Sequence, residues 1–330
     1  MKETKVSDKL SQTFATARIW CLLSIVAAHV SYPATFAETF WSRLGTVGVP
    51  LFLFMAGYFF VPSRFESVWQ LIKKKSLTIG VPWLCLGSLT WLYNAIQSSL
   101  FRSVEGYFNW MLGNGSYLYY IPVILLCFLL FYKAPKGVLY LALLINVLSV
   151  VLTAAGLLDF AVSFLGINHY LNVFNWLGFF TFGMLVQQVD DEKLLVFLRK
   201  TKWASIGLFL LTFIGLLLFQ NVPFYYFSYF AIPYELLGGW AILSLSTFSL
   251  TKISFFARLS GSSFGIYLVH MIFIGLLDRW LGFFEITRLL LPFVIVAVCF
   301  LFFLIGRLFS RRIRLEKAYA LVTGIRYLSP

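Results

Sequence analysis

Residues 18–29 read RIWCLLSIVAAH, in which an arginine and a histidine enclose ten residues that are almost entirely apolar. Such a segment is typical of a membrane-spanning helix, where ionisable side chains are costly and mark functional sites. The rest of the chain has the same character, since 60% of the 330 residues are hydrophobic and only 12% are charged, about half the charged share of a soluble domain. The sequence therefore predicts an integral membrane protein.

The apolar runs are close to 20 residues long, the length that an α-helix needs to cross the hydrocarbon core of a bilayer. We predict an all-α membrane protein, a single bundle of about ten transmembrane helices over residues 1–330, with no separate second domain. The predicted helices cover approximately residues 15–33, 44–61, 77–98, 116–132, 137–156, 171–188, 203–219, 226–247, 260–277 and 289–309.

The positive charges gather on one side of this predicted bundle. Of the 26 Lys and Arg residues, twenty fall in segments on the side of the N-terminus, and Arg18 and Arg307 lie at helix ends on that side. The opposite loops hold Arg43, Arg102, Arg279 and Arg288. Because Lys and Arg accumulate in cytoplasmic loops, the N- and C-termini are predicted to be cytoplasmic. The net charge of +13 then reflects membrane topology, and no binding of nucleic acid is expected.

Arg18 and His29 lie on one face of the first predicted helix. Eleven residues bring an α-helix to within roughly 20° of its starting direction and raise it by about 16 Å. Both side chains are therefore expected to face the bundle interior or a polar cavity, because either would be costly against lipid. The alternative is that Arg18 reaches the cytoplasmic headgroups and that His29 only caps the helix before Tyr32 and Pro33.

Two further stretches share the character of this helix: residues 45–60 read GTVGVPLFLFMAGYFF, and residues 262–270 read SSFGIYLVH. In this order, the three stretches resemble the acyltransferase-3 family of bacterial membrane acyltransferases, which has an Arg-x10-His motif in its first helix. The resemblance covers the length of the chain. It departs from the family at Ala56, where serine is usual, and at residues 73–75, where KKK replaces an arginine-rich signature found in many members.

The resemblance implies transfer of an acyl group, most often acetyl, from cytoplasmic acyl-CoA to a hydroxyl or amine of a carbohydrate, frequently a lipid-linked or exported glycan. It also implies the bacterial cytoplasmic (inner) membrane. On this interpretation Arg18 holds the donor, and His29 takes the proton of the acceptor hydroxyl, since an imidazole suits that task near neutral pH. Acetyl-CoA is then a co-substrate, and no bound cofactor or metal ion is expected.

Other residues are candidates for binding the donor or the acceptor, each with a structural alternative. Lys73, Lys74 and Lys75 suit the phosphates of CoA or simply enforce topology. Glu235, an acid inside a predicted span, suggests a partner for His29 or for the acceptor sugar, or a structural pair. His270, in the ninth predicted helix, is expected either to orient the acceptor or His29, or to bond across helices.

Three weaker signals lie toward the outer side of the predicted bundle. Arg43, placed just before the second helix, suits an anionic acceptor or lipid headgroups. His169 is interpreted as a loop residue. Several aromatic residues suit either a sugar or the interfacial belt, namely Tyr107, Trp110, Tyr117, Tyr119 and Tyr120.

A transporter or flippase is the alternative function, with Arg18, His29 and Glu235 lining a proton- or substrate-coupled path. Transporters typically show paired halves with broken helices in corresponding positions. The sequence shows no such correspondence, and we therefore favour the enzyme.

Overall fold

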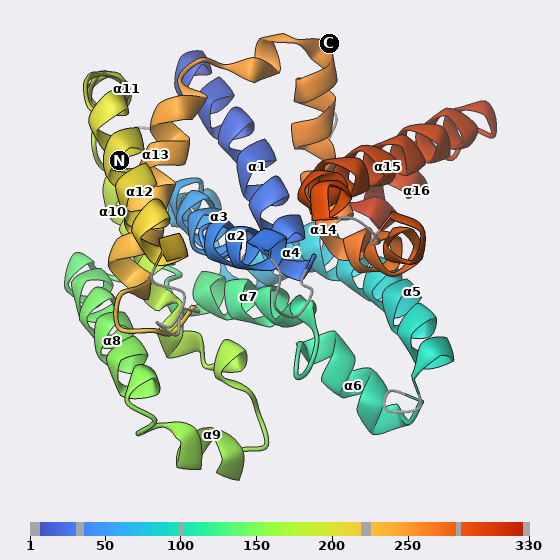
Figure 1. Cartoon of the computed structure of the whole chain (residues 1–330), viewed down its shortest axis with the longest axis horizontal. Coiled ribbons are helices and arrows are strands. Elements are labelled where there is room, and N and C mark those ends of the chain that lie inside the picture. The colour runs from blue at the N-terminus through green and yellow to red at the C-terminus, as the bar shows by residue number, and fades with distance from the viewer. Residues whose placement is uncertain (1–6, 31–35, 99–101, 219–225, 282–284, 326–330) are drawn as a thin grey trace.

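The computed structural model describes residues 7–30, 36–98, 102–218, 226–281 and 285–325. These residues form helices joined by turns, with no β-strand among them (Figure 1). The α-helices are α1 (Asp8–His29), α2 (Phe36–Gly45), α3 (Gly48–Tyr58), α4 (Val68–Lys75), α5 (Val81–Gln97), α6 (Val104–Leu112), α7 (Tyr120–Leu130), α8 (Lys136–Ala154), α9 (Asp159–Phe164), α10 (Leu177–Val186), α11 (Asp191–Lys200), α12 (Lys202–Leu218), α13 (Ala231–Ser246), α14 (Ser254–Leu281), α15 (Glu285–Arg312) and α16 (Glu316–Thr323).

The described helices are those of a multi-pass membrane protein, but the ten predicted spans are not all confirmed. By length and composition, six helical segments can cross a membrane, and the number rises to eight if the bent pairs α6 with α7 and α11 with α12 each count as one span. The six are Asp8–His29, Thr39–Tyr58, Val68–Gln97, Lys136–Ala154, Ser254–Leu277 and Thr287–Arg312.

The predicted span at residues 171–188 is the clearest difference. The side chain of Asn168 accepts a hydrogen bond from the backbone N–H of Leu171, and that of Asn172 accepts one from Phe174. Asparagine favours such local turns over a continuing helix, so two short 3-10 turns, His169–Leu171 and Val173–Asn175, take the place of the start of the expected span. Only α10, ten residues long, remains helical. The eighth expected span is also shortened, since α13 has sixteen residues.

Helix α1 lies at the centre of the bundle, where it contacts α2, α3, α13, α14 and α15 (Figure 1). Its start is fixed twice at Ser7, whose hydroxyl accepts a hydrogen bond from Leu10 and whose backbone N–H donates to the Asp191 carboxylate at 2.7 Å. Apolar residues occupy all sides of the helix, as is typical of a helix surrounded by others. This central position brings both motif residues of α1 into contact with the interior.

The two described ends of the chain meet at one end of the bundle. Ser11, near the start of α1, and Gly324, just after α16, line the same cavity. These two residues are therefore neighbours in the fold. That both termini lie on the cytoplasmic side of the membrane stays a prediction from the distribution of Lys and Arg.

Helices α3 and α10 approach each other closely at two glycines. A Cβ atom added to Gly57 would overlap the backbone carbonyl of Phe180, and one added to Gly183 would overlap the carbonyl of Phe54. Small residues at such positions let two membrane helices pack backbone to backbone. The close approach of α3 and α10 thus depends on the absence of a side chain at Gly57 and at Gly183.

We expect Gly57→Ala and Gly183→Ala each to lower the free energy of unfolding by about 1–3 kcal/mol, the usual cost of overpacking. Gly207→Ala in α12 is the matched control, because no atom lies within 4 Å of the added Cβ and alanine favours a helix over glycine. Thermal unfolding of the purified proteins in one detergent measures all three. If Gly57→Ala melts no lower than Gly207→Ala, the close approach of α3 and α10 does not support the fold.

Candidate active site

Two histidines from distant parts of the chain lie together. His29 is the last residue of α1, His270 lies in α14, and their ring centroids are 5.2 Å apart. The ring of Tyr117, which begins the turn η4 (Tyr117–Tyr119), lies 4.8 Å from His270 and 5.8 Å from His29. We call these three residues the histidine cluster. The structure thus brings together His29 and His270, two of the residues that the sequence singled out.

Hydrogen bonds between η4 and α14 hold this cluster in place. The Tyr117 hydroxyl donates to the backbone carbonyl of Leu268 at 2.5 Å, and the Tyr267 hydroxyl donates to the carbonyl of Tyr117 at 2.6 Å. Each tyrosine is therefore anchored to the element that carries the other. Such a reciprocal pair fixes the position of the Tyr117 ring against His270.

The His270 ring has a defined tautomer. Its Nδ1 lies 2.6 Å from the backbone carbonyl of Tyr267, and because a carbonyl only accepts hydrogen bonds, Nδ1 must carry the hydrogen. Nε2 then presents a lone pair. This Nε2 is buried and has no hydrogen-bond partner within the described residues. It can accept a hydrogen bond from the neighbouring imidazole or from a substrate.

A polar cavity of about 510 Å³ lies along the earlier part of α1. We call it the Arg18 cavity. Arg18 and Lys75 are the charged residues among those described that line it, and both are positive. Five residues with hydroxyl groups also line it: Ser11, Thr78, Tyr120, Ser260 and Ser263. The hydroxyl of Ser260 is buried and has no partner within the described residues, so this wall is suited to an anionic, hydrogen-bonding ligand.

Aromatic rings support both cations of the Arg18 cavity. The guanidinium of Arg18 lies 5.4 Å from the ring centroid of Phe59, and the ammonium of Lys75 lies 3.3 Å from that of Phe128. Both distances are within the range of cation–π contacts. The rings therefore hold the two charges along the cavity wall rather than in bulk solvent.

The three lysines at 73–75 form the last turn of α4. Successive residues of a helix point about 100° apart, so the three side chains cannot share one direction. Lys75 lines the Arg18 cavity, whereas Lys73 and Lys74 are exposed. The structure thus separates one candidate from the other two.

A single tyrosine lies between the Arg18 cavity and the histidine cluster. The ring of Tyr267 is 5.6 Å from that of Tyr120 and 6.4 Å from that of Phe264, two residues of the cavity wall. On its other side it is 5.7 Å from the ring of Tyr117 and 6.0 Å from that of His270. Tyr267 therefore contacts both the wall of the Arg18 cavity and the histidine cluster.

Glu235 and Arg43 are buried elsewhere. Glu235, in α13, is only 2% exposed and lines a different cavity of about 470 Å³. Arg43 does not precede the second span but lies within it, in α2, and is 6% exposed. The hydroxyl of Tyr234 donates to its backbone carbonyl at 3.0 Å. Arg43 was expected just before the second helix, but α2 extends the helical segment past this residue.

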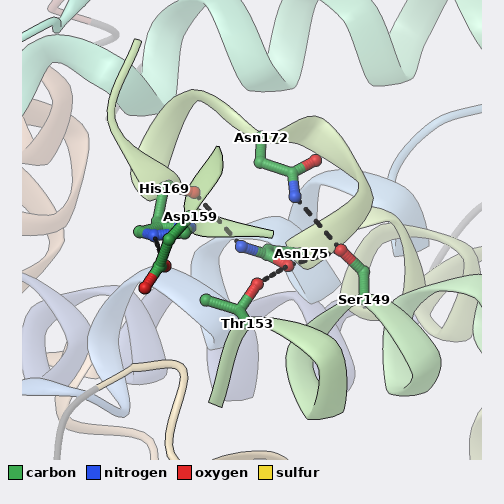
Figure 2. A network of polar contacts seen from close by, with 6 residues as sticks. All are labelled: Ser149, Thr153, Asp159, His169, Asn172 and Asn175. Carbon is green, nitrogen blue, oxygen red and sulfur yellow. Dashed lines mark hydrogen bonds and ion pairs between the residues drawn. The ribbon is translucent and has the colours of Figure 1, made fainter. Parts of the chain in front are cut away.

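A second polar network joins the end of α8 to the turns before α10 (Figure 2). His169 lies in a 3-10 turn, as expected of a loop residue, and its Nε2 is 2.9 Å from the Asp159 carboxylate. Nearby, the Asn175 side chain accepts hydrogen bonds from the hydroxyls of Ser149 and Thr153 at 2.6 and 3.3 Å. Most polar side chains of this network form hydrogen bonds with one another, which is typical of a structural role.

Tyr117 and Tyr267 have a part in the site that was not predicted from the sequence. Tyr117 is buried rather than placed in the interfacial belt. For Tyr267 a signal was present, because it stands three residues before His270 and so shares a helix face with it. For Tyr117 no local signal exists, since its contact with the histidines arises only from the packing of η4 against α14.

The comparison with protein families agrees with this arrangement. The family model described as an acyltransferase domain, Acyl_transf_3, matches residues 14–310, nearly the whole chain. Searches of curated proteins and of solved structures gave no match. The matched range holds α1 with Arg18 and His29, the turn η4 and the part of α14 that carries His270. The chain therefore belongs to the acyltransferase-3 family and is a membrane acyltransferase.

Proposed function

We propose that the protein transfers an acyl group, most readily acetyl, from acyl-CoA to a hydroxyl of a cell-envelope carbohydrate in the bacterial cytoplasmic membrane. One observation carries the proposal: α1 bears Arg18 in the wall of a cationic cavity and, about 16 Å further along, His29 in the histidine cluster. A single rigid helix thus links a site suited to an anionic donor with a candidate general base.

The Arg18 cavity suits acyl-CoA by charge and size. CoA carries phosphates, and the planar guanidinium of Arg18 matches a phosphate through two parallel hydrogen bonds, while Lys75 adds a point charge. A volume of about 510 Å³ falls within the usual range of small-molecule sites. Tyr120 and Phe264 of the cavity wall contact the ring of Tyr267, which in turn contacts His270, so in the proposed complex the thioester end of the donor extends past Tyr267 toward the histidine cluster.

The histidine cluster supplies the groups for the transfer itself. In the proposed reaction, a ring nitrogen of His29 takes the proton of the acceptor hydroxyl as the oxygen attacks the thioester carbonyl. The carbon–sulfur bond then breaks, the proton passes to the leaving sulfur, and the products are an ester and free CoA. His270 acts through its Nε2 lone pair, which positions either the His29 ring or the acceptor hydroxyl.

The acceptor is proposed to be a carbohydrate such as a lipid-linked or exported glycan, following the family resemblance. The proposal is tested by mass spectrometry of envelope glycans from cells with and without the protein, where we expect acylation only when the protein is present. Purified protein with acetyl-CoA and the acylated class of glycan should then release free thiol. Absence of CoA release with that acceptor would contradict the proposal.

The arrangement of cavities favours this enzyme over a transporter. Arg18 and Glu235, two of the three groups of the transporter hypothesis, line different cavities. The described residues therefore do not form one polar path through these three groups.

Replacing Lys75 by Gln should weaken acetyl-CoA binding about tenfold, because a charge-assisted hydrogen bond contributes about 1.5 kcal/mol or more. The affinity should also depend less on salt, since one charge attraction is lost. The double variant Lys73→Gln/Lys74→Gln is the matched control and should bind within about twofold of wild type, because both side chains are exposed outside the cavity. Equilibrium binding at two salt concentrations measures this. If acetyl-CoA affinity falls equally in the single and the double variant, the three lysines act only through their general positive charge and Lys75 has no specific contact with the donor.

A further inference from the structure

Helix α16 and the two residues after it, 316–325, fold back against α15, and we call them the α16 strap (Figure 1). The Tyr319 hydroxyl donates a hydrogen bond to the carbonyl of Phe303 at 2.8 Å, and the Arg307 guanidinium donates one to the Glu316 carboxylate at 3.2 Å. Later residues of α16 thus meet earlier residues of α15, so the two helices run antiparallel and are tied together by side chains.

The end of the α16 strap is wedged between two other helices. A Cβ atom added to Gly324, directly after α16, would lie 2.8 Å from the Phe264 ring of α14 and 3.0 Å from Pro82 of α5. One added to Gly265 of α14 would lie 3.0 Å from the carbonyl oxygen of Thr323. Glycine lets backbones approach this closely because it has no side chain to fill the space.

This wedge is also part of the wall of the Arg18 cavity. Gly324 lines the cavity together with Arg18 of α1 and Phe264 of α14. Its two neighbours, Thr323 and Ile325, are 4% and 3% exposed. The chain is therefore a packed wall at this point rather than an exposed tail.

The α16 strap lies beyond the part of the chain that the family model matches, which ends at residue 310. A helix of eight residues is not stable by itself, so α16 keeps its position through its packing on α5, α14 and α15. A ligand that touches the strap adds to those contacts, and by thermodynamic reciprocity the strap then raises the affinity for that ligand.

We infer that the α16 strap completes the donor site: acyl-CoA in the Arg18 cavity contacts the strap at Gly324, and its affinity depends on the strap being in place. A further wall covers more of the ligand surface. It also keeps water away from the phosphates and the two cations, which strengthens their attraction. The inference rests on the proposed function, since it takes the Arg18 cavity as the site of the donor.

Hydrogen–deuterium exchange of the wild-type protein, with and without saturating acetyl-CoA, tests this contact. We expect the backbone amides of the α16 strap to exchange about fivefold more slowly with acetyl-CoA, the effect of about one net hydrogen bond. The peptide around Arg18 should be protected as well. The control is the peptide of α8 around Leu144, which is exposed and does not line the cavity, and its exchange should not change.

The two possible failures give different results. Slower exchange around Arg18 with no change in the α16 strap would overturn the inference and leave the donor site in place. If acetyl-CoA slows exchange at neither segment, the Arg18 cavity is not the donor site, and the inference falls with that part of the proposed function.

A pair of glycine variants tests whether the α16 strap supports donor affinity. Gly324 and Gly166 both have a left-handed backbone, with φ of +67° and +63°, so alanine strains the backbone similarly at either position. In Gly324→Ala the added Cβ also meets Phe264 and Pro82, whereas in Gly166→Ala nothing lies within 4 Å of it. We expect the Kd for acetyl-CoA to rise about fivefold or more in Gly324→Ala, the equivalent of one net hydrogen bond, and to stay near wild type in Gly166→Ala.

Unchanged or tighter binding of acetyl-CoA in Gly324→Ala would overturn the inference, because the strap would then be only a support for the fold or an obstruction. Equal losses in the two glycine variants would also overturn it, since backbone strain alone would account for them. The exchange measurement on the wild-type protein does not depend on whether Gly324→Ala folds, so it decides the question by itself if that variant is unstable.

Discussion

His29→Ala is expected to lower the rate of acyl transfer at least about 100-fold, because general acid–base catalysis by a positioned side chain contributes about 10²–10⁴-fold. The variant should stay folded, since the structure gives the His29 ring contacts with other rings but no hydrogen bond that its loss would leave unpaired within the described residues. The measurement is the initial rate of CoA release in the presence of acceptor, with acetyl-CoA binding measured alongside. Binding should remain near wild type, because the Arg18 cavity lies beyond Tyr267.

His169→Ala is the matched control, because it removes the histidine of the separate network shown in Figure 2. It should retain most of the transfer activity. His270→Phe, which keeps a ring in place without nitrogen atoms, is expected to lower kcat about tenfold with little change in the KM for acyl-CoA, the effect of one lost hydrogen bond. If His29→Ala keeps more than about a tenth of the wild-type rate, His29 is not the general base.

Arg18→Gln is expected to raise the Kd for acetyl-CoA about 10- to 100-fold, since hydrogen bonds to charged groups contribute about 1.5–3 kcal/mol. Glutamine keeps a polar side chain but is shorter, uncharged and unable to form the bidentate contact with phosphate. Arg102→Gln is a suitable control, because the Arg102 guanidinium bonds to backbone carbonyls at the end of α5 and does not line the cavity. Equilibrium binding in detergent compares the two variants.

Wild-type donor affinity in Arg18→Gln would show that the Arg18 cavity is not the donor site. The remaining positive groups at the same end of the bundle would then be examined, beginning with Arg64, Arg258 and the run Arg311, Arg312 and Arg314.

Hydropathy predicted where the helices lie better than where they begin and end. For α1 the sequence suggested residues 15–33, but the helix begins at Asp8, because Ser7 caps its N-terminus and a polar first turn can pack against α11 through Asp191. A window of apolar residues cannot detect such a turn. The same method overestimated the segment at 171–188, where asparagine side chains compete for backbone hydrogen bonds.

Helical periodicity alone predicted one part of the candidate site, namely which residues of a helix share a face. The spacing of Arg18 and His29 fixes a shared face on any α-helix, and α1 indeed carries Arg18 in a cavity and His29 in the histidine cluster. Periodicity could not show which neighbour meets that face, so the contact of His29 with Tyr117 depends on tertiary packing. Nor could it choose among the three lysines, because the choice depends on the rotation of α4 about its axis.

The ring of Tyr267 has a consequence for the cell that houses the protein. On the proposed function, the donor enters the Arg18 cavity from one side of the membrane and the acceptor reaches His29 from another direction. If water joined these two sites, protons could cross the bilayer. The membrane potential acts on each such charge with about 2.3 kcal/mol per 100 mV. Tyr267 is buried, and its hydroxyl is committed to the backbone of Tyr117. On the proposed function, this packed ring would keep water from joining the donor site to the acceptor site, so that acyl groups could be handled inside the bilayer while the ion gradient of the cell is preserved.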